Sequence, residues 1–412
     1  MKLMFFHLMP YTKLPADFAE KHGSVWVDID PKLFDASEAG GMYNDFIDEF
    51  EAAAKLGFDA VCVNEHHSNG YGLMPSPNLI AATLARNTRD AAICLLGNSL
   101  ALYNPPIRVA EEVAMLDCIS RGRIIAGFPV GTPMDTCFAY GQNPSSLRQR
   151  YYEAHDLILR AWASDQPFAF SGRFNDQRYV NPWPRPLQKP HPPIWVPGGG
   201  SVETWEWCGR MEYVFCYLSY FGYQFARSAV SEFWRYMDKI GKDRNPYRTG
   251  FLQFVGVAES TEEAWELYRE PAEYFYGRCL RISPRFVDPP GYMSEGSRRA
   301  KAASSVASAA KIAGKGGVST EFDQIVKNGF VIIGNPDEVA EQLRKATLDL
   351  NVGHLMVLLQ FGNMKHDLVL ENTRLFAERV APQLQGLFDD EWEDRWWPQG
   401  AARAANPSAR VR

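Results

Sequence analysis

Short apolar runs alternate with segments of helical spacing along most of this sequence, and that alternation restricts the fold more than any other feature. Runs typical of buried strands occupy residues 2–6, 60–63, 91–96, 124–127, 194–196, 213–217, 251–257, 330–334 and 354–359. Amphipathic helical segments lie between them, for example at residues 43–56, 108–119, 151–162 and 336–348. Strand and helix units that repeat at this spacing favour a parallel sheet covered by helices.

The size and composition suit one large globular domain. A chain of 412 residues could hold two or three average domains, but α/β barrels of this length often fold as one. Hydrophobic residues make up 46% of the chain, which is enough for a sizeable core. We expect one domain over residues 1–384, with an insertion at about 270–328, and a tail at 385–412. The composition of the insertion leaves open whether it is a helical lid or a mobile segment.

The charge and cysteine patterns argue against several classes of protein. The formal net charge is -6 and no basic block could follow a phosphate backbone, so nucleic acid is not an expected partner. No apolar stretch is long enough to span a membrane, and the N-terminus lacks the pattern of a signal peptide. The seven cysteines are scattered, odd in number and mostly within apolar runs. These patterns predict a reduced, cytoplasmic protein that does not contact a membrane.

Four polar side chains, Asn64, Glu65, His66 and His67, directly follow the second apolar run. Loops at the carboxyl ends of parallel strands often carry catalytic residues. Side chains alternate along an extended chain, so Asn64 and His66 should point one way and Glu65 and His67 the other. Only one of the two histidines can therefore face a pocket directly. The alternative is that the pair only caps loops and satisfies backbone groups.

A glycine loop of Gly198, Gly199, Gly200 and Ser201 stands between the fifth apolar run and the next helical segment. Glycines in this position let backbone N–H groups approach an anion, and the helix dipole favours an anion there. The loop lacks the lysine of a P-loop and the spacing of a dinucleotide fingerprint. The sequence therefore leaves two interpretations open, a phosphate site and a tight turn without a ligand.

In their order and spacing these features resemble the bacterial luciferase-like, flavin-dependent monooxygenases over residues 2–384. The likeness rests on the segments 64–67, 97–100, 105–112, 120–123, 193–201 and 331–340. It implies a TIM (β/α)8 barrel with insertions that binds reduced FMN at its carboxyl face. It also implies a homodimer or homotetramer.

The resemblance assigns roles to particular residues. His66 would act near the flavin as a catalytic base or a peroxide-stabilising group. The cofactor-binding residues would be Asn98 and Ser99 beside the isoalloxazine ring, in a region that often has a non-prolyl cis peptide, then Tyr151 near the flavin, and Gly198, Gly199, Gly200 and Ser201 around the phosphate. The sequence departs from luciferases proper at Pro129-Val130, where those proteins carry a Cys-Arg pair. An arginine contact to the cofactor is thus lost or supplied elsewhere, by Arg148 or Arg150.

The activity that the resemblance implies is a two-component monooxygenase. Such an enzyme uses reduced FMN and O2, through a flavin C4a-peroxide, to oxygenate a small organic and mainly apolar substrate. The sequence has no second convincing nucleotide site, so the reduced FMN should come from a separate NAD(P)H:flavin reductase. A peroxide on the flavin survives only where water and stray protons are excluded, which favours an apolar, aromatic pocket with one titratable group.

Three alternatives remain at this point. One is an oxidoreductase that uses a deazaflavin, F420, on the same barrel, and another is a flavin-binding protein without turnover. The third is a metal-dependent hydrolase that uses Glu65, His66 and His67, with His354 and His366 as extra ligands. Adjacent residues on one strand point to opposite faces and cannot easily chelate one ion, so we expect no metal site.

Overall fold

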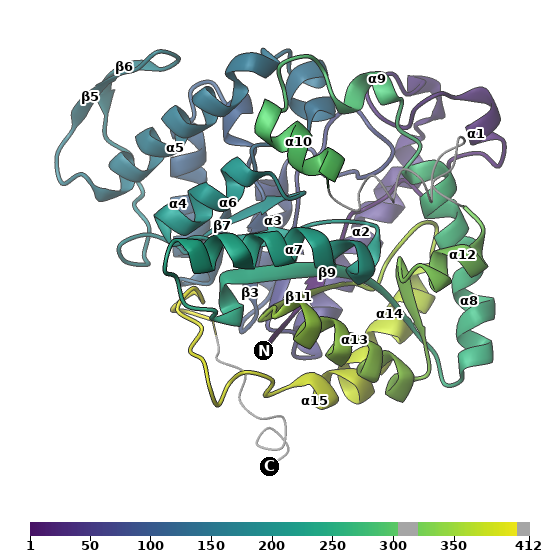
Figure 1. The fold of residues 1–412 in the computed structure, drawn as a ribbon. Coiled ribbons are helices and arrows are strands. Elements are labelled where there is room, and N and C mark those ends of the chain that lie inside the picture. Colours follow the sequence, from purple (N-terminus) through teal and green to yellow (C-terminus); the bar gives the residue numbers. More distant parts are fainter. Residues whose placement is uncertain (304–319, 402–412) are drawn as a thin grey trace.

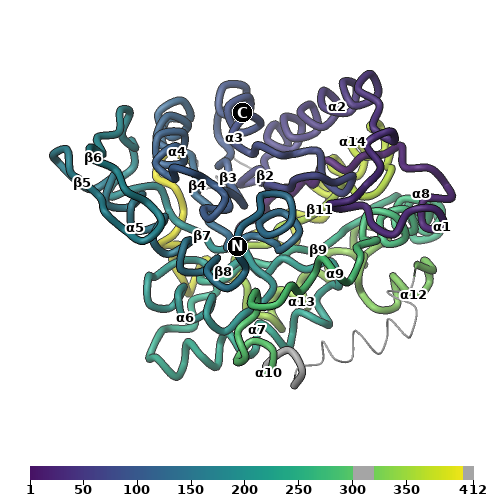
Figure 2. Tube along the Cα trace, turned by 90° about the horizontal axis from the view of Figure 1, so that it is seen from above, coloured from purple at the N-terminus to yellow at the C-terminus, as the bar shows by residue number. Residues whose placement is uncertain are grey.

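The computed structural model describes residues 1–303 and 320–401, and eight of its strands close into one parallel barrel. In ring order these strands are β1 (Lys2–Phe6), β2 (Ala60–Val63), β3 (Ala92–Leu96), β4 (Ile124–Gly127), β7 (Ile194–Gly198), β8 (Val214–Tyr217), β9 (Thr249–Val257) and β11 (His354–Leu358). The ring closes because β11 pairs with both β1 and β9, and β9 also pairs with β8. Figure 2 shows the strands grouped in the middle of the helices. The predicted TIM barrel is confirmed.

Helices cover the outside of the barrel, as Figure 1 shows. The longer ones are α2 (Ala36–Lys55), α3 (Pro77–Asn87), α4 (Ile107–Ser120), α5 (Leu147–Ala163), α6 (Val202–Met211), α7 (Gly222–Lys239), α8 (Thr261–Tyr274), α13 (Pro336–Leu350) and α14 (His366–Leu375). Several of these helices begin directly after a residue whose side chain caps the helix. Asp35 accepts hydrogen bonds from the first backbone N–H groups of α2, and Asn335 does the same for α13.

The strand β10 (Val331–Gly334) is predicted by the same kind of apolar run as the ring strands but lies outside the ring. Among the residues that the structure describes, it pairs only with the last part of β9, Phe254 to Val257. The first part of β9 pairs with β8 and β11. A strand of nine residues is long enough to serve both the ring and this extra neighbour.

A hairpin of β5 (Phe168–Ser171) and β6 (Asp176–Val180) projects from the end of α5, as predicted for residues 168–179. The Glu153 carboxylate on α5 holds its turn, because it accepts hydrogen bonds from the backbone N–H groups of Arg173, Phe174 and Asn175.

The segment predicted as an insertion contains several short helices, joined by irregular stretches, where the structure describes it. After α8 come a π-helix (Phe275–Cys279), α9 (Pro284–Val287), α10 (Glu295–Ala303) and α12 (Phe322–Lys327). Helix α10 packs against α6, the helix that follows the glycine loop. Residues 304–319 lie outside the described residues. The division of the chain into a barrel, an insertion and a tail remains a prediction.

Residues 385–401 run across the amino-terminal mouth of the barrel. The N-terminal amine of Met1 donates to the Leu387 carbonyl at 2.6 Å and pairs with Asp389 at 2.7 Å. His354, the first residue of β11, pairs with Asp394 at 2.9 Å. These contacts join the two ends of the described chain to the bottom of the barrel.

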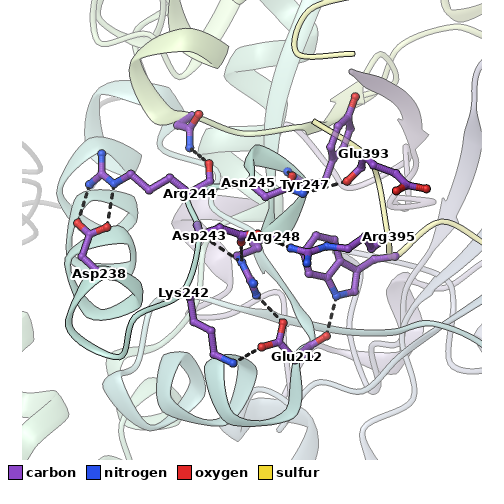
Figure 3. Close-up of polar contacts among 12 residues, drawn as sticks. Glu212, Asp238, Lys242, Asp243, Arg244, Asn245, Tyr247, Arg248, Glu393 and Arg395 are labelled. Carbon is purple, nitrogen blue, oxygen red and sulfur yellow. Dashed lines mark hydrogen bonds and ion pairs between the residues drawn. The ribbon is translucent and has the colours of Figure 1, made fainter. Parts of the chain in front are cut away.

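Polar contacts continue this junction on the neighbouring surface, which Figure 3 shows. Arg395 of the tail pairs with Asp243 at 2.6 Å, and Asp243 also accepts from Arg248 at 2.5 Å. The side chain of Asn245 donates to the Glu393 carbonyl at 2.9 Å. The tail is therefore held by both main-chain and charged contacts. None of the helices described here is both long enough and apolar enough to cross a membrane.

Candidate active site

The polar residues that follow β2 form a network around the carboxylate of Asp135. His66 Nδ1 lies 3.0 Å from Asp135 Oδ2, and the backbone N–H of His67 donates to Asp135 Oδ1 at 2.8 Å. Asp135 is buried and lies in a π-helix (Met134–Ala139) after β4. The segments that follow β2 and β4, two strands separated by β3 in the ring, thus meet at one carboxylate.

Two further donors fix the orientation of Asp135. The indole N–H of Trp26 donates to Oδ1 at 2.9 Å, and the Thr132 hydroxyl donates to Oδ2 at 3.0 Å. Each carboxylate oxygen therefore has two partners. Trp26 comes from the long connection between β1 and α2, which is one reason why sequence analysis missed its place in the site.

The contact with Asp135 leaves one nitrogen of His66 available. A carboxylate accepts a hydrogen bond, so Nδ1 carries the proton of the neutral ring and Nε2 is an acceptor. Among the residues that the structure describes, Nε2 has no hydrogen-bond partner, and the side chain is 14% exposed. Such a nitrogen can take up a proton from a molecule that binds beside it.

His67 has a different partner and no comparable freedom. Its Nε2 lies 3.2 Å from Glu65 Oε1, and its side chain is buried. Glu65 also accepts from the Tyr103 hydroxyl at 2.8 Å and from the backbone N–H of Ser99 at 2.6 Å. Burial, and next the charge of Glu65, raise the pKa of Tyr103, so its hydroxyl stays protonated and donates. This geometry favours His66 over His67 as the reactive residue.

Asn98 lies in the same region, after β3. Its Nδ2 donates to Asn78 Oδ1 at 3.1 Å and to the Tyr103 hydroxyl at 3.0 Å. Its Oδ1 is buried and has no partner within the described parts of the chain. A non-prolyl cis peptide joins Leu96 to Gly97. A buried carbonyl without a donor is costly unless a ligand supplies an N–H group.

Aromatic rings enclose one side of His66. The rings of Trp26 and Tyr71 stack with centroids 4.7 Å apart, and the His66 ring lies 4.9 Å from Trp26 and 5.0 Å from Tyr71. Both aromatic side chains are buried. These rings exclude water from this side of the imidazole.

The glycine loop forms the end of β7 and the start of α6. A Cβ atom at Gly199 would meet no atom within 4 Å, so the loop opens to free space there. Ser201 caps α6 by accepting from the Thr204 backbone N–H at 3.3 Å. Arg148 donates to Ser201 Oγ at 3.2 Å, whereas Arg150 stacks on Phe174 of the hairpin. Of the two arginines considered for the cofactor, Arg148 is the one at the loop.

Tyr151 lies one turn of α5 beyond Arg148 and is almost fully buried. Its hydroxyl donates to the Phe128 carbonyl at 3.0 Å, and burial raises its pKa. The hydroxyl is therefore committed to the main chain. The expected contact of Tyr151 with a flavin remains a prediction.

The residues present fit a flavin mononucleotide. The buried Asn98 Oδ1 lacks a donor of the kind that the N–H edge of a flavin ring offers. The helix terminus, the open glycine and Arg148 together suit a phosphate. In the described part of the chain, no hydrogen bond joins the His66 network to the glycine loop directly. The His66 network and the glycine loop follow different strands, and both lie at the carboxyl face of the barrel.

The extra histidines of the hydrolase alternative are elsewhere. His354 is the first residue of β11, at the opposite mouth of the barrel, and pairs with Asp394. His366 pairs with Glu49 at 3.0 Å. Within residues 1–303 and 320–401, no three histidine, cysteine or acidic side chains are placed to hold a metal ion.

Comparisons with known proteins place the chain in a family. A sequence profile described as luciferase-like monooxygenase matches residues 29–349. Limonene 1,2-monooxygenase from Rhodococcus erythropolis is 24% identical over 360 residues, which cover 85% of this chain and 84% of that protein.

Two solved structures show the same fold. The oxygenating constituent of 3,6-diketocamphane monooxygenase from Pseudomonas putida, in complex with FMN, has a TM-score of 0.69 and 19% identity, with 93% of this chain and 99% of that chain covered. An F420-dependent secondary alcohol dehydrogenase, in complex with an F420-acetone adduct, has a TM-score of 0.60 and 17% identity, with 92% and 98% covered. Because the family profile spans most of its length, this chain belongs to the luciferase-like monooxygenase family.

Proposed function

We propose that the protein is the oxygenase component of a two-component monooxygenase, which takes reduced FMN and O2 and oxygenates a small, mainly apolar organic molecule. The observation that carries the proposal is the contact of His66 with the buried carboxylate of Asp135. It leaves one imidazole nitrogen available beside an aromatic wall. Membership of a monooxygenase family supports the same reaction class.

The residues of this chain would bind the cofactor and the substrate, orient the proton-transferring group and exclude water from it. When bound, reduced FMN supplies the electrons that activate O2. Asp135 holds the proton on His66 Nδ1, so His66 Nε2 is the atom that accepts a proton from the reacting molecule and returns it. Trp26 and Tyr71 exclude water from that atom, which limits loss of the activated oxygen to solvent.

The phosphate of the cofactor would lie at the start of α6, held by Arg148, Ser201 and the backbone of the glycine loop. We also propose that residues 288–303, which follow α9, cover this end of the cofactor. Ser297 donates to Glu203 in the first turn of α6 at 2.6 Å, and the Tyr292 hydroxyl donates to the Gly131 carbonyl at 2.7 Å.

A separate NAD(P)H:flavin reductase would be the partner that supplies reduced FMN. The structure of similar fold from Pseudomonas putida is described as the oxygenating constituent of its enzyme, which supports a divided system. A homodimer or homotetramer and a cytoplasmic location remain predictions from the sequence.

Rapid mixing tests the proposal. The protein is loaded anaerobically with chemically reduced FMN and mixed with oxygenated buffer, and the return of oxidised-flavin absorbance is followed. We expect a return much slower than that of free reduced FMN, because the site excludes water and controls the proton. A return as fast as that of free FMN would contradict the proposal.

An F420-dependent oxidoreductase is the second candidate, favoured by the fold shared with the F420-dependent alcohol dehydrogenase. The same barrel face could hold a deazaflavin, whose ring transfers hydride without activating oxygen. Equilibrium titration with FMN and with F420 separates the two candidates. Tighter binding of F420 than of FMN, together with fast oxidation of any bound reduced FMN, would favour this candidate.

A further inference from the structure

Two tyrosine hydroxyls meet near the candidate base. Tyr71, in the loop after β2, donates to the hydroxyl of Tyr220, in the loop after β8. Tyr71 is fully buried, whereas Tyr220 is partly exposed. A ligand could therefore contact the side chain of Tyr220 but not that of Tyr71.

The hydroxyls of Tyr71 and Tyr220 together carry one more hydrogen-bond donor than their mutual hydrogen bond needs. Two neutral phenols carry two protons, and their mutual hydrogen bond occupies one of them. Burial raises the pKa of Tyr220, so its proton stays in place at neutral pH. In the chain as described, neither hydroxyl has another partner. The Tyr220 proton is thus left without an acceptor.

The surroundings of Tyr220 cannot supply that acceptor easily. Its ring lies 5.8 Å from the ring of Phe275 and 6.0 Å from the ring of Phe254. A donor enclosed by apolar rings is costly to leave unpaired, and a bound ligand with an oxygen acceptor removes that cost. The backbone carbonyl of Tyr220 is held by the Tyr276 hydroxyl at 2.6 Å, which fixes the loop.

The position of the pair connects it with the reaction. The Tyr71 ring lies 5.0 Å from the His66 ring and stacks on Trp26. Tyr220 is therefore separated from the candidate base by a single ring. A molecule held by the Tyr220 hydroxyl would therefore bind close to the aromatic rings that enclose His66.

We propose that Tyr220 is a specificity-determining donor that binds an oxygen atom of the substrate. The substrate class is then an apolar molecule with one hydrogen-bond acceptor, such as a carbonyl, and not a plain hydrocarbon. This inference rests on the proposed function, because it places the substrate beside His66. Tyr71 orients the donor without touching the substrate.

A matched pair of probes tests the assignment. Acetophenone and ethylbenzene have nearly the same size, and only the first carries a carbonyl. Calorimetric titration of the protein saturated with oxidised FMN should give acetophenone an affinity about 2- to 10-fold higher, the range for one neutral hydrogen bond. Tyr220→Phe should remove this preference and leave ethylbenzene binding unchanged.

Two control variants sharpen the result. Tyr71→Phe removes the other hydroxyl but keeps the Tyr220 proton, so the preference should persist. Tyr179→Phe changes a tyrosine that is 84% exposed and should have no effect. Loss of the preference in Tyr71→Phe but not in Tyr220→Phe would overturn the assignment, and so would equal affinity for the two probes or binding of neither.

FMN affinity is measured in the same variants. Weaker FMN binding in Tyr220→Phe would mean that the donor serves the cofactor, and the proposal would be wrong. If the wild-type protein failed to bind FMN, the proposed function would fail. The preference for acetophenone could still be measured in that case without the cofactor, so the two failures are distinguishable.

Discussion

The two mouths of the barrel each contain a histidine paired with an aspartate, but only one pair has the geometry of a reactive site. At the carboxyl mouth His66 contacts Asp135 at 3.0 Å, and at the amino mouth His354 contacts Asp394 at 2.9 Å. The His66 side chain is 14% exposed, whereas that of His354 is fully buried. The difference therefore lies in the second ring nitrogen and not in the pair itself.

The surroundings of His354 explain the contrast. Its ring packs against Trp195 at 4.4 Å and against Tyr247 at 5.3 Å, and Trp397 of the tail stacks over it. Nδ1 of His354 is buried without a partner in the described residues. No substrate could reach this nitrogen without displacing the tail. The pair of His354 and Asp394 at the amino mouth therefore has a structural role. This agrees with the rule that barrel enzymes have their catalytic residues at the carboxyl face.

Replacing His66 should give the largest effect on activity. We expect His66→Ala to lower substrate oxygenation about 10²- to 10⁴-fold, because the group that moves the proton is lost. Thermal unfolding and FMN affinity should remain close to those of the wild type. Product yield per reduced FMN measures the loss. His354→Ala is the matched control, and it should lower stability and leave the yield of the folded enzyme unchanged.

The tail should affect stability without affecting chemistry. Trp396 is 8% exposed and donates to the Glu212 carbonyl at 2.7 Å. Trp396→Ala should lower the free energy of unfolding by about 3–5 kcal/mol, as for other buried tryptophans. Denaturant unfolding measures this, and Trp183→Ala, at a side chain that is 82% exposed, should show no change. Unaltered stability of Trp396→Ala would mean that the tail does not support the barrel.

The carboxylate that orients His66 should matter less than His66 itself. In Asp135→Asn one oxygen becomes an NH2 group, which cannot accept from two of the present donors. We expect kcat to fall about 10- to 100-fold through misplacement of the imidazole, with little change in KM for reduced FMN. An equal fall in kcat for Asp394→Asn would remove the contrast between the two mouths.

The phosphate end of the site can be tested by charge alone. Gly199 has free space around its Cβ position, so Gly199→Ala should be tolerated. Gly199→Asp places a carboxylate beside the expected phosphate and should weaken FMN binding at least about tenfold through repulsion. Fluorescence titration with FMN measures both variants. Equal FMN affinity of Gly199→Ala and Gly199→Asp would mean that the phosphate binds at another position.

The barrel follows from the sequence because buried parallel strands leave a local signal. Each ring strand is a mainly apolar run of four to nine residues that is buried over most of its length. The same signal does not distinguish β10 from a ring strand, because β10 is also buried. Its place outside the ring depends on pairing with the far end of β9, which the sequence does not display.

The sequence indicates only some of the residues of the candidate site. His66 and the glycine loop stand at strand ends, where polar residues are easily noticed. Asp135 lies 69 residues from His66 along the chain, and nothing local indicates that they meet. The same holds for residues 385–401 of the tail, which have no periodic pattern and make contacts with residues far away in the sequence, such as the contact of Asp394 with His354.

A third histidine and carboxylate cluster joins His7, directly after β1, to Glu49 on α2 and His366 at the start of α14. His7 Nδ1 accepts from the Met9 backbone N–H at 2.8 Å, so its Nε2 carries the proton and donates to Glu49 at 2.7 Å. Glu49 also contacts His366 at 3.0 Å. Burial raises the pKa of Glu49 to about 8 and lowers the pKa of His7 to about 3. This cluster should therefore act on stability and not on catalysis.

The two shifts have opposite signs, and this makes the pH dependence specific. Between the ordinary pKa of Glu49, 4.5, and its folded value of about 8, the folded state holds a proton that the unfolded state has lost, so stability falls as pH rises. Between about 3 and the ordinary pKa of His7, 6.5, the unfolded state holds the extra proton, so stability rises with pH. The two effects cancel between 4.5 and 6.5, and only the fall due to Glu49 remains between 6.5 and 8.

Glu49→Gln should therefore abolish a loss of about 1–2 kcal/mol between pH 6.5 and 8 and uncover a rise below pH 6.5 due to His7. Urea unfolding at a series of pH values measures both parts. Asp48→Asn removes an exposed carboxylate next to Glu49 on α2, whose charge is the last of the causes of the raised pKa and burial the first, so the fall above pH 6.5 should persist. If Glu49→Gln kept the fall above pH 6.5, another group would be responsible for it.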